Sequence, residues 1–414
     1  MRETAAGPAT ANLTRIAMIA ACQFPFPQGS QVLIGQLAAA LQRRGHAVRL
    51  LTYPDGLGAS PAGVSVQRIP RLPGLGPIRG PLSPQKPVLD LRLVRALRRL
   101  LHTWPVDVVH AHNIEGLAVA LAAARGRFAG VPVVYHIHNA MSLELHTHFR
   151  SRPARWLAGL AGRWLDAELP RRAGWCIVLT EAAVPFFRER GVTWLSCIPA
   201  GIDLDAGDAA QAREILGPGP LVLYSGNLEP YQNLDLLFEA FRQVAAARPA
   251  ARLVLSTNAR THERQDCAEA LGFGGKALFV PSHDFGAVRN LLAAADVAVC
   301  PRVACLGLPI KLLNYMVAAR PIVVSAGSAG SLRHMENAWV VPNNNVDGMA
   351  AAILALLDDP ALARRLGEAA RRTVETHHHW DRVVQDVEAV YAGVLAGRDQ
   401  VHRSAASRPA AGIR

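Results

Sequence analysis

The chain has 414 residues, of which 50% are hydrophobic and 18% charged, and its formal net charge at pH 7 is +12. The composition is that of a globular protein. The chain is too long for a single hydrophobic core of ordinary size, and its length suits two domains of about 200 residues each. No apolar run reaches the about 20 residues that a membrane-spanning helix needs, and no signal-peptide pattern is found, so we expect a cytoplasmic protein.

Strands and helices alternate along the first half, which predicts a doubly wound parallel sheet. Residues 1–12 are expected to be disordered and 13–198 to form the first Rossmann-like domain. The Gly/Pro-rich stretch 54–87 is expected to lack regular structure and to serve either as an acceptor-side lid or as a plain connection. The expected strands are 14–21, 47–52, 106–110 and 131–136, and the expected helices are 32–44 and 89–102.

The same alternation resumes after residue 198 and predicts a second Rossmann-like domain over 199–378. A helix at 379–396 is expected to cross back to the first domain, followed by a disordered tail at 397–414. The expected strands of this half are 221–225, 251–257, 277–280, 297–300 and 321–325, and the expected helices are 234–247, 264–271, 285–294 and 311–319, with further helices after 346.

The stretch 301–325 carries the clearest functional signal. An apolar strand ends at Pro301, a Gly/Pro loop follows, and a helix then begins at Lys311. In a parallel sheet this arrangement places the loop and the helix N-terminus at the carboxyl edge, where backbone N–H groups and the helix dipole favour phosphate. Lys311 adds a full positive charge there, so the sequence predicts an anion site.

The stretch resembles the donor-site helix of the retaining glycosyltransferases of family 4, also called glycosyl transferases group 1. That resemblance implies the GT-B fold, in which two Rossmann-like domains enclose a cleft. Members commonly carry two glutamates separated by seven residues; here Asn314 replaces the second, and the first would fall near Leu306. The resemblance therefore implies an atypical branch that lacks both glutamates. The run 198–203 also resembles the family's crossover between domains.

The turn after the strand 221–225 is similar to the family's diphosphate-binding turn. Asn227 and Gln232 stand where related enzymes carry arginine and lysine, and amides supply no charge. Stabilisation of the leaving diphosphate is therefore expected from Lys311, Arg302 and the backbone. The resemblance implies nucleobase contacts from the loop of His283, and Asn314 can bond ribose or sugar hydroxyls. The expected donor-binding residues are Gly226, Asn227, Gln232, His283, Arg302, Gly307, Leu308, Pro309 and Asn314.

Histidines occur in alternating pairs after two strands, at His110 and His112 and at His136 and His138. Alternate residues share one face of a strand, so each pair can converge. A metal site is the alternative, but no carboxylate or cysteine pattern completes it, so no metal is expected. The resemblance puts His138 at the reaction centre, as a catalytic residue with Lys311. The expected acceptor-binding residues are Gln28, Gly29, Ser30, His112, Asn113, Glu115 and Asn139.

The resemblance implies retaining transfer of a sugar from a nucleotide sugar to a hydroxyl acceptor, with UDP-sugar favoured over GDP-sugar. No cofactor is expected beyond this co-substrate, and the expected acceptor is a lipid-linked saccharide, a polysaccharide intermediate or a natural product. Two alternatives stay open: a catalytically weak nucleotide-sugar-binding or partner subunit, and a nucleotide-sugar epimerase.

The positive charge is concentrated in arginine-rich stretches at 92–99, 150–172 and 364–372. Excess base attracts polyanions, so peripheral association with an anionic membrane surface at the inner face is one expectation. A solvated arginine-rich helix face is the other. Nucleic acid is not expected, because no zinc finger, RNP run or helix-turn-helix signature is found.

Overall fold

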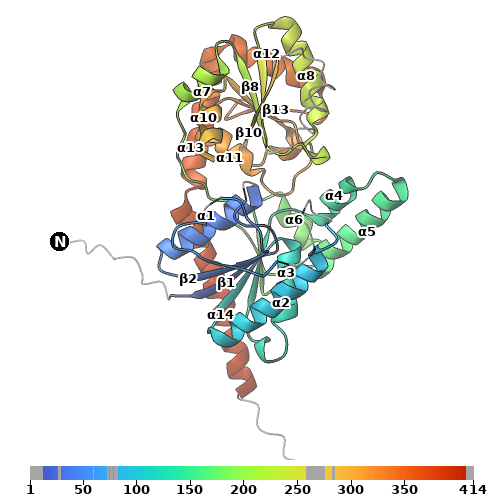
Figure 1. Ribbon diagram of the computed structural model, residues 1–414, viewed down its shortest axis with the longest axis vertical. Helices are drawn as coiled ribbons and strands as arrows, with labels where there is room; N and C mark the ends of the chain where they lie inside the picture. The colour runs from blue at the N-terminus through green and yellow to red at the C-terminus, as the bar shows by residue number, and fades with distance from the viewer. Residues whose placement is uncertain are drawn as a thin grey trace, which may run out of the picture.

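The computed structural model describes residues 13–26, 29–58, 60–71, 74, 78, 83–257, 276–281 and 285–406. These residues form two α/β domains stacked along the long axis of the molecule, each with helices on both faces of a parallel sheet (Figure 1). Gln28, His283 and the expected helix at 264–271 lie outside the described residues. No helix of the described chain is long and apolar enough to span a membrane.

The first domain is built on a seven-stranded parallel sheet with the order β3-β2-β1-β4-β5-β6-β7. The order reverses between β1 and β4, and ligands of doubly wound sheets bind at the carboxyl edge beside such a point. The strands are β1 (Arg15–Ala20), β2 (Ala47–Thr52), β3 (Ser65–Arg68), β4 (Val108–His112), β5 (Val133–Ile137), β6 (Trp175–Val178) and β7 (Leu195–Cys197). The helices are α1 (Gly29–Arg43), α2 (Lys86–Thr103), α3 (Asn113–Ala123), α4 (Met141–Glu144), α5 (Arg152–Glu168) and α6 (Ala183–Arg188), with short 3-10 turns η1 (Gly126–Phe128), η2 (Leu145–His148) and η3 (Pro170–Arg172).

The second domain has a six-stranded parallel sheet with the order β10-β9-β8-β11-β12-β13, which reverses between β8 and β11. Gly226 directly follows β8 and Pro301 directly follows β11, so both expected donor loops lie at this reversal. The strands are β8 (Leu221–Ser225), β9 (Arg252–Thr257), β10 (Ala277–Pro281), β11 (Val297–Cys300), β12 (Ile322–Ser325) and β13 (Trp339–Val341). The helices are α7 (Ala209–Leu216), α8 (Leu234–Ala247), α10 (Phe285–Ala294), α11 (Ile310–Val317), α12 (Val346–Asp358), α13 (Pro360–His377) and α14 (Trp380–Ala406), with 3-10 turns η4 (Pro230–Gln232) and η5 (Ala326–Ser328).

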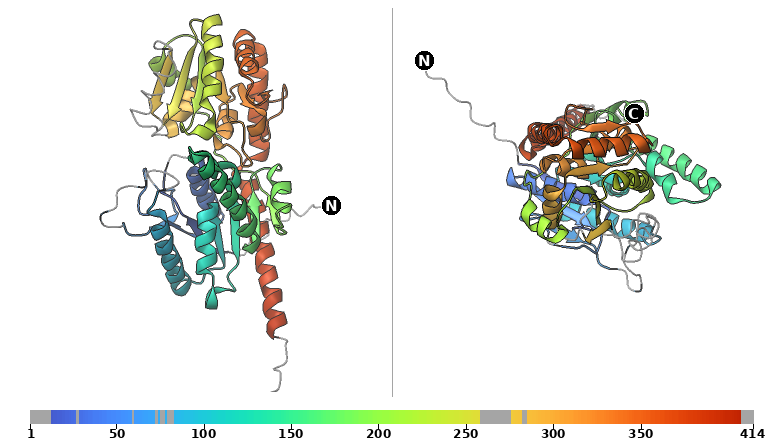
Figure 2. Two further views of the ribbon diagram at one scale, coloured as in Figure 1. Left: turned by 90° about the vertical axis from the view of Figure 1, so that its right-hand side faces the viewer. Right: turned by 90° about the horizontal axis from the view of Figure 1, so that it is seen from above.

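The last helix, α14, leaves the second domain and runs along the first (Figures 1 and 2). Its apolar residues share a core with the sheet of the first domain. Glu388 accepts hydrogen bonds from Arg44 Nε at 2.6 Å and Nη2 at 2.8 Å, and the Tyr391 hydroxyl lies 2.6 Å from His110 Nδ1. The helix continues ten residues beyond the Ala396 boundary expected from the sequence, to Ala406.

The chain passes between the domains twice, and the two passages are hydrogen-bonded to each other. Ile202 N donates to His378 O at 3.0 Å, and His378 Nδ1 lies 2.7 Å from Ala200 O. A Cβ on Gly201 would lie 2.5 Å from the ring of Trp380, so only glycine permits this approach. The two crossings therefore form one compact connection.

One strand departs from the sequence-based expectation. β3 lies inside the stretch 54–87, which was expected to be irregular. Its four residues, Ser-Val-Gln-Arg, lie at the edge of the sheet and none of them is fully buried, so they lack the apolar pattern that marks the inner strands.

Candidate active site

The two domains meet where the carboxyl edges of their sheets face each other. A Cβ on Gly307 would lie 1.9 Å from the carbonyl oxygen of His138, so a glycine is needed at this contact. The Thr180 hydroxyl donates to the carbonyl of Leu306, and Gly29, at the start of α1, packs against Ile310 at the start of α11. The loop 306–310 thus touches the first domain at several points.

Lys311 lies in the first turn of α11 and faces the loop that follows β8. Its Nζ donates a hydrogen bond to Gln232 Oε1 at 2.9 Å and lies 4.0 Å from the centroid of the Tyr224 ring, a cation–π contact. Desolvation by the surrounding protein lowers the pKa of Lys311 to about 8. No carboxylate pairs with it among the described residues. The site therefore holds a cation without an anion.

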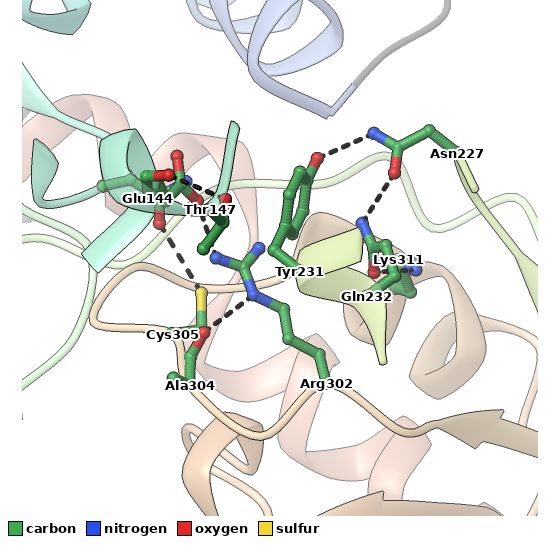
Figure 3. Close-up of polar contacts among 10 residues, drawn as sticks. Glu144, Thr147, Asn227, Tyr231, Gln232, Arg302, Ala304, Cys305 and Lys311 are labelled. Carbon is green, nitrogen blue, oxygen red and sulfur yellow. Dashed lines mark hydrogen bonds and ion pairs between the residues drawn. The ribbon is translucent and has the colours of Figure 1, made fainter. Parts of the chain in front are cut away.

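Amide groups orient this lysine (Figure 3). Gln232 accepts from Lys311 through Oε1 and donates through Nε2 to Asn227 Oδ1 at 3.0 Å. Asn227 in turn donates to the Tyr231 hydroxyl at 2.7 Å. Asn227 and Gln232, which were expected to stand in place of the family's arginine and lysine, form a neutral network that contacts Lys311 at the start of α11.

Gly226 makes room for the ammonium group. Its φ is +144°, in the region that favours glycine, and a Cβ at this position would lie 2.7 Å from Lys311 Nζ. A side chain at residue 226 would displace Lys311, so the observed position of Lys311 requires a glycine there.

Arg302 is buried and its charge is balanced by the other domain. Its Nη2 donates to Glu144 Oε1 at 2.7 Å, its Nε donates to Ala304 O at 2.9 Å, and its guanidinium lies 4.8 Å from the centroid of the Tyr231 ring. Glu144 belongs to α4 of the first domain, so this ion pair joins the domains directly (Figure 3). Of the two expected donor-side cations, Arg302 is paired and Lys311 is not.

Four histidines form a buried layer beneath the cleft on β4 and at the end of β5. His112 and His136 are direct neighbours across the two strands. His110 Nε2 lies 3.3 Å from His136 Nδ1, and His112 Nδ1 lies 3.2 Å from His138 Nε2. Burial lowers the pKa of His110 to about 3 and of His138 to about 4. All four rings are therefore neutral at neutral pH, since burial also lowers the pKa of His112 and His136 well below the usual range.

Ligand-capable nitrogens of His110, His112 and His136 lie within 4.8 Å of one another, the spacing of a candidate metal site. The Nε2 atoms of His112 and His136 have no hydrogen-bond partner among the residues that the structure describes. However, His110 Nε2 and His136 Nδ1 are hydrogen-bonded to each other at 3.3 Å, so an ion bound through these atoms would have to replace that hydrogen bond. The expectation of no metal stays a prediction.

The expected acceptor-side residues are dispersed. His112 is fully buried under His138, Asn113 begins α3 with a left-handed φ of +59°, and Glu115 accepts from Lys86 Nζ at 2.6 Å. Asn139 faces Cys305 of the second domain, with Sγ 3.6 Å from its Oδ1. Ser30 is partly buried at the start of α1. His112 is thus placed to support His138 rather than to meet a ligand itself.

The donor-side residues are closer together. Leu308 is buried and Pro309 precedes α11 without a side-chain cap, while Asn314 is partly exposed one turn beyond Lys311 on the same helix.

The sequence did not identify Glu144, Tyr224 or Tyr231 as site residues. Tyr231 lies within the donor turn and could have been found there, whereas no local signal links Glu144 to Arg302.

A cavity of about 420 Å³ lies along α1. Its lining is mainly apolar, with polar groups from Gln31, Gln36, Arg43 and Asp203. Gln36 Nε2 donates to Asp203 Oδ2 at 3.0 Å, so the cavity lies next to the crossing between the domains.

Two doubly wound parallel sheets that face each other by their carboxyl edges, with a last helix that returns to the first domain, define the GT-B fold. Residues 28–194 match the glycosyl transferase 4-like domain and residues 208–373 match glycosyl transferases group 1, so the chain belongs to the group 1 glycosyltransferases. The fold and family expected from the sequence are confirmed.

Individual relatives agree with this assignment over nearly the whole chain. The chain is 26% identical to phosphatidyl-myo-inositol mannosyltransferase of Mycolicibacterium smegmatis over 95% of this chain and 97% of that protein. Sucrose-phosphate synthase of Thermosynechococcus elongatus has the same fold, with a TM-score of 0.78, 20% identity and coverage of 93% and 100%. Anabaena Alr3699/HepE, solved with UDP-glucose, gives a TM-score of 0.68 at 18% identity, covering 92% of this chain and 99% of that one.

Proposed function

We propose that this glycosyltransferase moves a sugar, with retention of anomeric configuration, from a UDP-sugar on the second domain to a hydroxyl acceptor on the first. The observation that carries the donor assignment is Lys311. It is a desolvated cation with no carboxylate partner in the part of the chain that the structure describes, at a helix N-terminus beside the reversal point of the second sheet. Such a group favours an anion, and the donor's diphosphate is the anion that this fold supplies.

The reaction requires little covalent chemistry from the protein. The acceptor oxygen bonds to the anomeric carbon while the bond from that carbon to the diphosphate oxygen breaks. The diphosphate leaves with the electron pair, and the hydroxyl proton passes to its departing oxygen on the same face. Lys311 and the N-terminal end of α11 stabilise the charge that develops there.

His138 has a different part in this proposal. Because burial lowers its pKa to about 4, it is neutral at working pH and supplies a hydrogen bond rather than a positive charge. His112, which bonds its ring at 3.2 Å, restricts its orientation. A fixed neutral imidazole suits recognition of a sugar hydroxyl at the reaction centre.

Relatives guide the choice of substrates. The HepE structure contains UDP-glucose, which supports UDP as the nucleotide, and the mannosyltransferase is named for a phosphatidyl-inositol acceptor. We therefore place a lipid-linked saccharide or a polysaccharide intermediate before a small natural product as the acceptor. The transfer is proposed to proceed without a metal.

A specific observation favours one alternative, a nucleotide-sugar-binding protein that does not transfer. Asn227 and Gln232 bond to each other and give the diphosphate turn no charge of its own. In this alternative Lys311 would hold the nucleotide sugar without making its diphosphate a good enough leaving group.

The experiment combines nucleotide binding with product analysis. Calorimetric titration of UDP and GDP into wild type, Lys311→Met and Lys276→Met tests the donor site. Lys276 is a matched control because it precedes β10 at the opposite, amino edge of the same sheet. We expect UDP to bind wild type and Lys276→Met, and Lys311→Met to lose about tenfold or more in affinity.

Transfer is then followed by UDP release and by NMR of the product's anomeric configuration. Equal affinity of the two lysine variants would refute the donor assignment. Binding of UDP-sugars without UDP release across lipid-linked and soluble acceptors would favour the binding protein, and a changed sugar without UDP release would indicate an epimerase.

A further inference from the structure

Helix α5 is packed on one side by α4 and has an apolar outer side. Ala158, Gly162 and Asp166, spaced four residues apart, are its buried residues. A Cβ on Gly162 would lie 2.7 Å from the carbonyl oxygen of Met141 in α4, so the two helices are in close contact. This stripe fixes which side of α5 faces the protein.

Large apolar side chains occupy the opposite side. Trp156 is 66% exposed, Leu157 63%, Leu160 37% and Trp164 59%. At about 100° of rotation per residue, they cover an arc of about 100° centred opposite the buried stripe. A helix face that contacts water is normally polar, whereas the exposed side of α5 is apolar. We call these four residues the α5 apolar face.

This concentration is not the usual scatter of single apolar residues over a surface. Among the described residues, ten large hydrophobic side chains are exposed, and four of them belong to α5. Figures 1 and 2 show α4 and α5 projecting sideways from the first domain, with no other helix or strand of the described residues over the outer side of α5. A contiguous exposed apolar face of this kind indicates a contact surface.

The charges around the α5 apolar face have one sign. Arg152, Arg155 and Arg163 are exposed, and no described carboxylate pairs with them. The acidic residues of the helix are otherwise engaged. Asp166 points inward and accepts from the backbone N–H groups of Met141 and Ser142, both at 2.8 Å, and Glu168 pairs with the arginines that follow the helix.

These charges select among the surfaces that could cover α5. A second copy docked face to face would bring the arginines of both chains together without carboxylates to balance them, which is unfavourable. A neutral apolar partner would leave the arginines unused. An anionic lipid surface satisfies both features, because tryptophan rings suit the headgroup region and arginines suit lipid phosphates.

We propose that the α5 apolar face docks this protein on an anionic lipid bilayer. Trp156, Leu157, Leu160 and Trp164 enter the boundary between headgroups and acyl chains, and Arg152 and Arg163 contact lipid phosphates at its edge. The docked helix is tied to the cleft, because Asp166 holds the start of α4, and Glu144 at the end of α4 pairs with Arg302. Docking thus brings the opening between the domains to the membrane surface.

The test is flotation of the full chain with vesicles of phosphatidylcholine alone or with added phosphatidylglycerol. We expect wild type to float with the anionic vesicles, less so as salt rises, and weakly with the neutral ones. Trp156→Ser/Trp164→Ser lowers the partition coefficient about tenfold or more, because two large apolar side chains are removed. Arg152→Gln/Arg163→Gln lowers it on anionic vesicles alone. Trp194→Ser, at a tryptophan 60% exposed outside α5, is the matched control and floats as wild type does.

Each variant's melting temperature and its shift with UDP are measured first, so that a folding defect or a failed donor site is distinguished from lost docking. The proposal is overturned if wild type floats with neither vesicle, or if the double tryptophan variant floats as well as Trp194→Ser. It is also overturned if light scattering finds a wild-type dimer that Trp156→Ser/Trp164→Ser dissociates, because the face then belongs to a second copy.

Discussion

The buried histidine layer makes the first domain sensitive to acid. Burial lowers the pKa of His110 to about 3 and of His138 to about 4, against 6.5 in the unfolded chain. Below pH 6.5 the two histidines therefore bind protons in the unfolded state, whereas they remain neutral in the folded state until the pH approaches their lowered pKa values. The stability that this difference contributes is fully present above the unfolded pKa and is lost as pH falls toward the folded values.

The magnitude follows from the same linkage. At about pH 5 each of these two histidines costs about 2 kcal/mol, because only the unfolded state is protonated there, so the pair costs about 4 kcal/mol. His112 and His136, whose pKa values are also well below the usual range, add in the same direction. Equilibrium urea unfolding at about pH 7.5 and about pH 5 measures the total.

A non-titrating variant isolates one member of the layer. His110→Asn is expected to reduce the difference in stability between the two pH values by about 2 kcal/mol, whatever its stability at either one. His102→Asn, at an exposed histidine near the end of α2, should leave the difference unchanged. The reasoning is refuted if wild type is equally stable at both pH values, or if His110→Asn has the same pH dependence as wild type.

Further predictions concern the donor side. Affinity for UDP should fall as pH rises through about 8 in wild type and be flat in that range in Lys311→Met, because the free lysine loses its proton there; calorimetry across this range decides. Gly226→Ala should weaken UDP binding about tenfold by displacing the ammonium group, which the same titration measures, whereas Gly159→Ala, with open space around it, should bind normally. Glu144→Gln should lower the free energy of unfolding by about 3 kcal/mol, because a buried guanidinium loses its counter-charge; a change no larger than that of exposed Glu189→Gln would contradict this. Transfer activity should survive dialysis against a chelator, and loss that zinc restores would instead assign a metal to the histidine layer.

Much of the fold could be predicted because its inner elements carry strong local patterns. The strand 221–225 and the helices 234–247 and 285–294 were expected within the bounds that the structure gives. Each is an apolar run with a clear beginning and end. The edge strand β3 could not be found in this way, since three of its four residues are polar and it is identified as a strand by its pairing with β2.

The candidate site was predictable in part for a similar reason. Asn227 and Lys311 were assigned to one donor site from the resemblance to family 4, and the strand order of the structure places the loops after β8 and β11 side by side. Glu144 could not be assigned, because it meets Arg302 only when the domains close on each other. The exposed apolar face of α5 could not be predicted either. Its sequence has two stripes, and only packing against α4 decides which one is buried.

The paired crossings between the domains have a mechanical consequence. Because the segments at Ala200 and His378 are held together by hydrogen bonds, the domains share one pivot rather than two separate tethers. The second domain is then expected to move relative to the first by rotation about that pivot. The ion pair of Arg302 and Glu144 and the contacts of the loop 306–310 join the two domains away from this pivot, so these contacts would have to break for the domains to separate there.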